Sequence, residues 1–110
     1  MQDAIEAIAA PRRRDILRLV HGTELTAGAI AANFRDVSWP AISQHLRVLR
    51  EAGLLHERRD GTRRLYSADA RGLDDLREFL ERFWDERLET LKTEAQQEER
   101  SRRNARGNRN

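Results

Sequence analysis

The sequence predicts a mainly α-helical domain with one small β-hairpin. Apolar residues recur at the three- and four-residue spacing of amphipathic helices along most of the chain. A single Asp60-Gly61 pair separates two short arginine-rich segments, and such a pair is typical of a tight hairpin turn. Because 110 residues suit one modest core, we expect a single domain over residues 1–94 and a basic, disordered tail over residues 95–110.

Three helices are expected in the first third of the chain. Residues 3–9 form a short first helix, and Pro11 either interrupts it or opens the second helix, since proline is favoured in a first helical turn. The second helix is followed by Gly22 as a cap and has its apolar side at Ile16, Leu17 and Val20. Thr26 caps a third helix, which reaches Asn33.

A fourth helix and the hairpin come next. Ser38 caps this helix after a turn of about four residues, and Gly53 ends it. Its apolar residues recur at helical spacing: Ile42, Leu46 and Leu49. The strands of the hairpin are expected over residues 54–58 and 63–67, joined by a turn whose positive φ angle glycine supplies without steric cost.

The last helix is expected to begin near Asp69 or Ala70. Its apolar stripe consists of Leu73, Leu76, Leu80, Phe83, Trp84, Leu88 and Leu91. Beyond about Ala95 the apolar residues stop and arginines dominate, so we expect a fraying helix end and then the disordered tail.

Composition limits the classes of function. The chain has no cysteine, which excludes disulfides, thiolate metal sites and a cysteine nucleophile, and fits an intracellular, cytoplasmic protein. The apolar runs are too short for a membrane span or a signal peptide. An enzyme is not expected, because the sequence shows no glycine-rich phosphate loop and no serine in a nucleophile context.

Charge is unevenly distributed, although the formal net charge is only +2. Residues 47–64 hold six arginines and three acids, residues 73–94 hold eight acids and four bases, and residues 100–110 hold five arginines and no acid. Positive charge therefore gathers around the fourth helix and the hairpin, and again in the tail. Arginine clusters suit contact with phosphate because the guanidinium is planar and always charged.

The third and fourth helices have the spacing of a helix-turn-helix, whose second helix enters the major groove of DNA. With Ile42 pointing inward, helix periodicity turns Pro40, Ser43, Gln44 and Arg47 outward. Gln can pair with adenine, Arg with guanine and Ser with several base edges. Taken alone, this surface also fits an ordinary solvated helix.

The hairpin strengthens the DNA interpretation. Its sequence, ERRDGTRRLY, places a pair of arginines on each side of the turn, which suits phosphate or minor-groove contact. Alone, it is more typical of a solvated hairpin. Directly after a helix-turn-helix, it predicts a winged helix-turn-helix.

At these residues the chain resembles the ArsR-type winged helix-turn-helix transcriptional regulators. The resemblance covers about residues 2–92 and depends on PRRRDILRLV, SWPAISQHLRVLREAGLL and ERRDGTRRLYS. It implies a homodimeric repressor that binds double-stranded DNA at a palindromic operator. The DNA-facing residues that it implies on the fourth helix are Ser38, Pro40, Ala41, Ser43, Gln44, His45 and Arg47, and those on the wing are Arg58, Arg59, Arg63 and Arg64.

The chain departs from the metal-sensing members of that family. Their cysteine pair is replaced here by ELTAGAIAANF, and the last helix has no histidine between Leu73 and Leu91. We therefore expect no metal site and no cofactor, with a metal sensor that uses a non-cysteine site as the alternative.

Trp39 is a second departure from the family pattern, because the position beside the cap is usually smaller or polar. Three roles are open for its side chain: packing on the wing, packing on the turn and contact with a thymine methyl.

A homodimer is expected from the apolar surface of the terminal helices. The stripe of the last helix exceeds what so small a domain can cover, and pairing with a second copy would bury it. The interface residues predicted on the N- and C-terminal helices are Ile5, Ile8, Leu76, Phe79, Leu80, Phe83, Trp84, Leu88 and Leu91. Two alternatives stay open: the helix packs on its own domain, or the winged helix is a protein-interaction module. The sequence does not announce any small-molecule effector.

Overall fold

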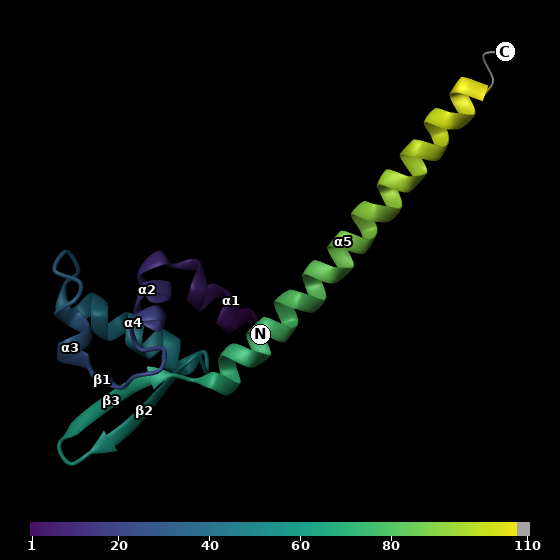
Figure 1. Ribbon diagram of the computed structural model, residues 1–110. Coiled ribbons are helices and arrows are strands. Elements are labelled where there is room, and N and C mark those ends of the chain that lie inside the picture. Colours follow the sequence, from purple (N-terminus) through teal and green to yellow (C-terminus); the bar gives the residue numbers. More distant parts are fainter. Residues whose placement is uncertain (108–110) are drawn as a thin grey trace. The chain divides into compact units, whose positions relative to one another are not determined.

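The computed structural model describes residues 1–107 and shows mainly helices with one small sheet (Figure 1). The elements are α1 (Gln2–Ala9), α2 (Pro11–Leu19), β1 (Leu25–Thr26), α3 (Ala27–Ala31), α4 (Trp39–Glu51), β2 (Leu55–Asp60), β3 (Arg63–Ala68) and α5 (Ala70–Gly107). The chain divides into two compact units, the first ending at Arg77 and the second beginning at Glu78. No helix in the described range is long and apolar enough to cross a membrane.

The helix caps follow the sequence prediction. The Thr26 hydroxyl accepts a hydrogen bond from the Ala29 amide at 3.1 Å, and the Ser38 hydroxyl accepts one from the Ala41 amide at 3.3 Å. Both side chains satisfy amides that a first helical turn leaves unpaired. Pro11 opens α2, which is one of the two roles predicted for it, and Gly53 follows α4 with a φ of 78°.

The predicted hairpin is confirmed and is longer than expected. Strands β2 and β3 pair antiparallel from Leu55↔Ala68 to Asp60↔Arg63, so only Gly61 and Thr62 form the turn. Gly61 has a φ of 64°, as a first turn residue of the II′ type requires. The sequence did not predict β1, which adds to β3 by pairing Leu25 with Tyr66; two residues are too few to show an alternating pattern.

The first unit has one apolar core, to which every element before Glu78 contributes. Its largest fully buried side chains are Ile16, Val20, Ile30, Ile42, Leu49 and Leu54. Leu76, which was predicted to lie in the dimer interface, is only 5% exposed and belongs to this core. The first turns of α5 are thus part of the domain. Asp69 caps them by accepting a hydrogen bond from the Gly72 amide at 3.0 Å.

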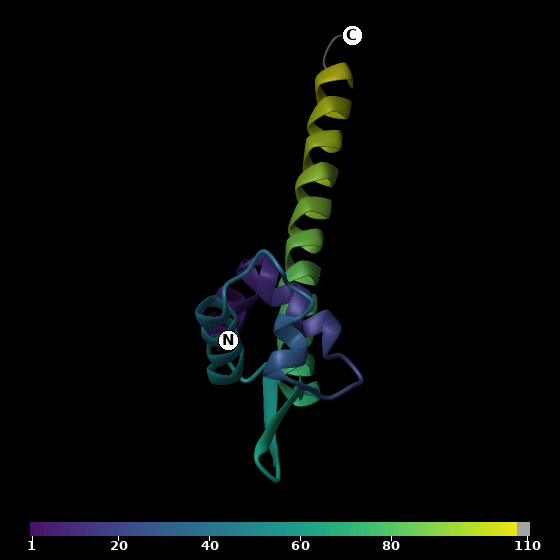
Figure 2. The ribbon, with the colours of Figure 1, turned by 90° about the vertical axis from the view of Figure 1, so that its left-hand side faces the viewer.

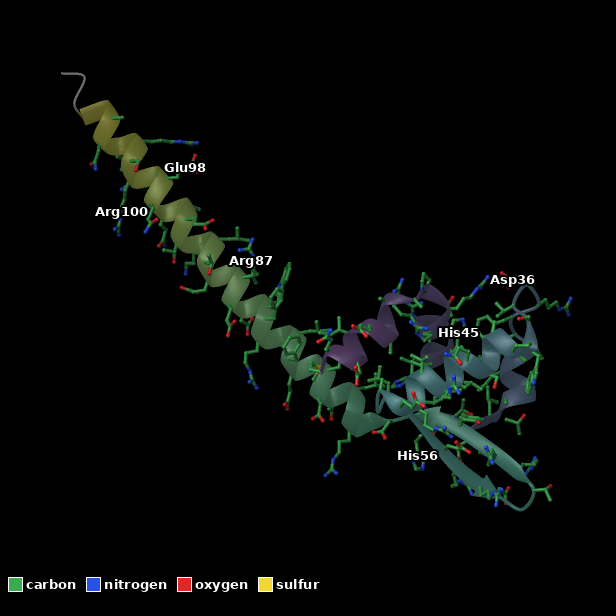
Figure 3. All side chains as sticks on the ribbon, turned by 180° about the vertical axis from the view of Figure 1, so that it is seen from behind. Asp36, His45, His56, Arg87, Glu98 and Arg100 are labelled. Carbon is green, nitrogen blue, oxygen red and sulfur yellow. The ribbon has the colours of Figure 1, made fainter. Side chains whose placement is uncertain are left out.

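An arginine holds α1, α2 and α4 together. The Arg13 guanidinium donates to the Ala7 carbonyl at 2.6 Å and to the Glu6 carbonyl at 3.2 Å, and lies 3.4 Å from His45 Nδ1. Burial lowers the pKa of His45, and the charge of Arg13 lowers it further. His45 projects from α4 (Figure 3) and is half-buried in this contact.

The second unit is the continuation of α5. The sequence predicts that helical order ends near Ala95, but α5 continues to Gly107, and residues 108–110 lie outside the described range. Glu, Gln, Ala and Arg dominate residues 94–106 and are strong helix formers. Ion pairs across one helical turn add to this, Glu98 with Arg102 at 2.7 Å and Glu99 with Arg103 at 3.0 Å.

Gly72 lets the start of α5 pack closely against the backbone at Gly53, and a residue with a Cβ atom would prevent this. A Cβ atom at this position would lie 1.8 Å from the carbonyl oxygen of Gly53. We predict that Gly72→Ala lowers the free energy of unfolding by about 1–3 kcal/mol or more, because backbone must move. Gly28→Ala is the control: its Cβ would meet only Thr26 Oγ1, at 4.0 Å, so urea denaturation should show a neutral or slightly stabilising change. Equal losses at both positions would contradict the close approach.

The environment of His45 predicts a pH dependence of stability. Because its pKa is lowered in the folded chain, the unfolded chain takes up the proton first as pH falls. The contribution of His45 to stability is therefore complete above the unfolded value of 6.5 and is lost as pH falls through the folded pKa. Urea denaturation measures the free energy of unfolding at each pH. Between about pH 7.5 and about pH 5.5 this free energy should fall more steeply for the wild type than for His45→Gln. Equal slopes would show that the fold does not hold His45 neutral.

Candidate nucleic-acid interface

Burial of one side of α4 determines which of its residues face solvent. Ile42, Leu46 and Leu49 are buried, whereas Ser43, Gln44 and Arg47 are exposed, as predicted. The Arg47 guanidinium donates a hydrogen bond to Gln44 Oε1 at 2.7 Å. Two long polar side chains are therefore aligned side by side on the outer surface of the helix, where each can turn to a base edge.

The other predicted residues of α4 differ in exposure. Ser38 and Pro40 are exposed, Ala41 is partly buried, and His45 is half-buried against Arg13.

The turn before α4 covers residues 32–38, which is longer than the predicted four residues. This is because α3 ends at Ala31, after which the Asn33 and Phe34 amides bond to carbonyls three residues back rather than four. Arg12 pairs with Asp36 in this turn and lies over the Phe34 ring.

The four predicted wing arginines are all exposed, and three of them pair with carboxylates. Arg58 donates two hydrogen bonds to Glu24, at 2.8 and 2.9 Å, which lower the pKa of Glu24 and raise that of Arg58. Arg63 lies 3.1 Å from Asp60. Arg59 stands opposite Arg64 in the β2–β3 register, so two cations share one rung of the hairpin.

Glu57 links the wing to α4. It is half-buried and pairs with Arg50 of α4 at 2.5 Å and with Arg64 of β3 at 3.3 Å. The hydrogen bond with Glu57 raises the pKa of Arg50. Sequence reasoning missed the roles of Glu24, Arg50 and Glu57, because these pairs join separate elements and leave no local pattern.

A groove lies between α4 and the wing. It has a volume of about 460 Å³ and is lined by Trp39, Ser43, Arg47 and Arg50 of α4 and by Arg63 and Arg64 of β3, with Leu46 and Tyr66 among its other residues. The hairpin projects beyond the helices of the first unit (Figures 1 and 2). The groove is thus bordered by cations from two elements and contains apolar surface, which suits a ligand with both phosphates and apolar groups.

The histidines do not gather at one place. His45 lies on α4 and His56 on β2 (Figure 3), and His21 follows α2. Within residues 1–107, no group of three or more His, Cys, Asp or Glu side chains is arranged to hold a metal ion.

The remaining predicted interface residues lie on α1 and α5. Ile8 packs against the core and Ile5 is 37% exposed. Phe79, Leu80, Phe83, Trp84, Leu88 and Leu91 are all exposed by 40% or more. The Phe79 and Phe83 rings stack with their centroids 6.5 Å apart. A run of exposed apolar side chains on one helix is typical of a surface that contacts another protein, a membrane or a ligand.

Sequence comparisons agree with this geometry. Residues 8–58 match a family model for a helix-turn-helix domain. The HTH-type transcriptional regulator Rv2034 of Mycobacterium tuberculosis is 49% identical over 82 residues, which cover 74% of this chain and 75% of the relative. The transcriptional repressor SdpR of Bacillus subtilis is 37% identical, covering 76% and 91%. The transcriptional activator HlyU of Vibrio cholerae is 30% identical, covering 73% of each.

Solved structures of the same fold extend the comparison. An ArsR-like transcriptional regulator from Rhodococcus sp. RHA1 superposes with a TM-score of 0.72 at 28% identity, covering 86% of this chain and 89% of that one. The homodimeric winged helix-turn-helix DNA-binding domain of Mb0332 from Mycobacterium bovis gives a TM-score of 0.61 at 29% identity, covering 77% and 78%. The matched sequences, the cap and core of α4 and the arginine-rich hairpin all agree, and the chain belongs to the ArsR-type family of winged helix-turn-helix transcriptional regulators.

Proposed function

We propose that this chain is a cytoplasmic repressor that binds a palindromic DNA operator as a homodimer and needs no metal ligand. The proposal depends mainly on three exposed polar side chains, Ser43, Gln44 and Arg47. They face outward beside the cationic hairpin because the opposite side of α4 is buried. Side chains of these types read base edges in the major groove. The metal-independent part is supported by the absence of cysteine, since no thiolate ligand is available.

The wing supplies affinity in this proposal. Arg59, Arg63 and Arg64 are exposed at the hairpin, and pairs such as Arg63–Asp60 are on the surface, where an ion pair contributes little. Arg63 can therefore exchange its carboxylate partner for a DNA phosphate at small cost. Arg58 is proposed to contribute less, because Glu24 holds its guanidinium with two hydrogen bonds.

The dimer is proposed from the exposed stripe of α5. A second copy offers the same stripe, and a two-fold arrangement buries both. A palindromic operator follows, because two recognition helices related by two-fold symmetry read two half-sites about one DNA turn apart. The homodimeric Mb0332 domain has the same fold and supports this arrangement.

Titration of DNA tests the proposal. The purified chain, treated with chelator, is titrated against a labelled duplex selected from a randomised pool and against a scrambled duplex at two salt concentrations. Tight binding of two chains to the selected duplex, weakening with salt, is expected. Equally weak binding to both duplexes would overturn the proposal and favour a protein-interaction module. If the chelator-treated chain bound the selected duplex only after metal was added, the alternative of a non-cysteine metal site would be favoured.

The direction of regulation needs a separate assay, because the relatives include both a repressor and an activator. The selected duplex is placed across a promoter and transcripts are measured in vitro with and without the chain. Fewer transcripts are expected, since a bound dimer would exclude the polymerase. More transcripts would show that the chain is an activator.

Substitutions on α4 and on the wing should differ in their effects. We predict that Gln44→Ala or Arg47→Ala costs about 1–3 kcal/mol on the selected duplex and little on the scrambled one, because base contacts are lost. Arg63→Ala should weaken binding to both duplexes and reduce the salt slope by about 1, because a phosphate contact is lost. Fluorescence anisotropy measures both. An unchanged sequence preference in the α4 variants would show that this helix does not read bases.

A charge introduced into the stripe should break the dimer. We predict that Leu80→Glu raises the dimer dissociation constant by at least about a hundredfold, because an apolar side chain is lost from both copies. Arg82→Glu is the control, since two residues advance about 200° around a helix and place Arg82 on the other side. Analytical ultracentrifugation should show monomers for Leu80→Glu and dimers for Arg82→Glu. A monomeric wild type would contradict the proposed interface.

A further inference from the structure

Trp39 is the first residue of α4, and its side chain is 57% exposed. A single exposed aromatic residue is common on protein surfaces and indicates nothing by itself. The surroundings of Trp39 are unusual, because it lines the groove between α4 and the wing with Ser43 and Arg47 of its own helix. An apolar ring therefore lies among polar and cationic groups that the proposed function assigns to DNA.

Helix geometry places these residues in one row. Trp39, Ser43 and Arg47 follow one another at intervals of four residues, and each is turned only about 40° from the one before, so they form one row along α4. Residues at the start of a recognition helix contact base edges most directly. Whatever base pairs Ser43 and Arg47 reach, the Trp39 ring lies one turn further toward the start of the same helix.

Two other uses of the Trp39 ring fit the structure less well. The ring does not belong to the buried core, because more than half of its surface is exposed. If the groove faced the same groove of a second copy of the chain, the arginines of the two copies would repel each other, which disfavours this contact. These arginines are Arg47, Arg50, Arg63 and Arg64. DNA instead offers phosphates for the arginines and, in its major groove, the thymine methyl as an apolar group.

We propose that Trp39 contacts a thymine methyl group in the major groove of the operator and so contributes to base choice. This inference rests on the proposed function, since it assumes that α4 enters DNA. It adds to Gln44 and Arg47 a residue that reads shape and apolar surface instead of hydrogen-bonding groups. The contact needs no movement of the core, because the ring already lies in the open groove.

The first experiment uses the wild-type chain and modified DNA. Each thymine of the selected duplex is replaced in turn by deoxyuridine, which lacks the methyl group and keeps every hydrogen-bonding atom. At one thymine position in each half-site, the single replacement is expected to weaken binding about fourfold, which is the effect of one buried methyl-sized group. The same replacement should change the affinity of Trp39→Ala less than twofold. No effect of any replacement on the wild type, or an equal effect on both proteins, would overturn the inference.

The second experiment observes the ring directly. The chain has two tryptophans, Trp39 and Trp84, so the fluorescence change that DNA causes in the wild type is compared with that in Trp39→Phe. A change in the wild type that is absent from Trp39→Phe is expected, since only Trp84 remains in the variant. Trp39→Phe should also bind more tightly than Trp39→Ala, because it keeps an aromatic ring. An identical fluorescence change in both proteins would show that the DNA does not reach Trp39.

The two proposals fail in different ways. If the unmodified wild type does not prefer the selected duplex over the scrambled one, the proposed DNA-binding function itself fails. If it does prefer the selected duplex while the deoxyuridine and fluorescence results are negative, only the role of Trp39 fails. Thermal unfolding of Trp39→Ala checks its fold, and the deoxyuridine result on the wild type stands even if this variant is unstable.

Discussion

Burial of one side of α4 is the constraint on which the rest of the structure depends. Ile42 and Leu49 are completely buried and Leu46 nearly so, and this fixes the rotation of the helix about its axis. A rotation by one residue would bury Ser43 and expose Ile42, at the cost of an apolar contact and of an unpaired hydroxyl. The Ser38 cap and Gly53 fix where the same helix begins and ends. The outward row of polar residues is thus a consequence of core packing.

Carboxylates arrange the arginines of the wing. Glu57 joins α4 to β3 through Arg50 and Arg64, and Glu24 ties Arg58 to the loop before β1. These pairs lie mostly on the surface, so they orient side chains more than they stabilise the fold. Of the charge that the sequence places near the hairpin, one part serves the internal geometry and another part is open to a ligand. The chain can have a low net charge and still present a cationic groove, because arginines outnumber acids in residues 47–64 whereas acids outnumber bases in residues 73–94.

The long helix α5 has two roles along its length. Its first turns belong to the first unit, where Asp69 caps it, Gly72 approaches Gly53 and Leu76 enters the core. From Glu78 onward its apolar residues are exposed, while Arg87, Glu98 and Arg100 project from it into solvent (Figure 3). A continuous apolar stripe in the sequence therefore covers two different environments, and periodicity does not distinguish them.

The sequence by itself determined the elements that depend on neighbouring residues. Helix caps, the periodicity of α4 and the glycine turn were predictable because each is set within a few residues. Tertiary structure decided the rest: the short strand β1, the half-buried position of His45, the core position of Leu76 and the carboxylate partners of the wing. Continuation of α5 to Gly107 was missed because apolar periodicity stops there, whereas charged residues sustain the helix. Contacts between residues such as Glu24 and Arg58, 34 positions apart, exist only once the chain has folded, so no local pattern encodes them.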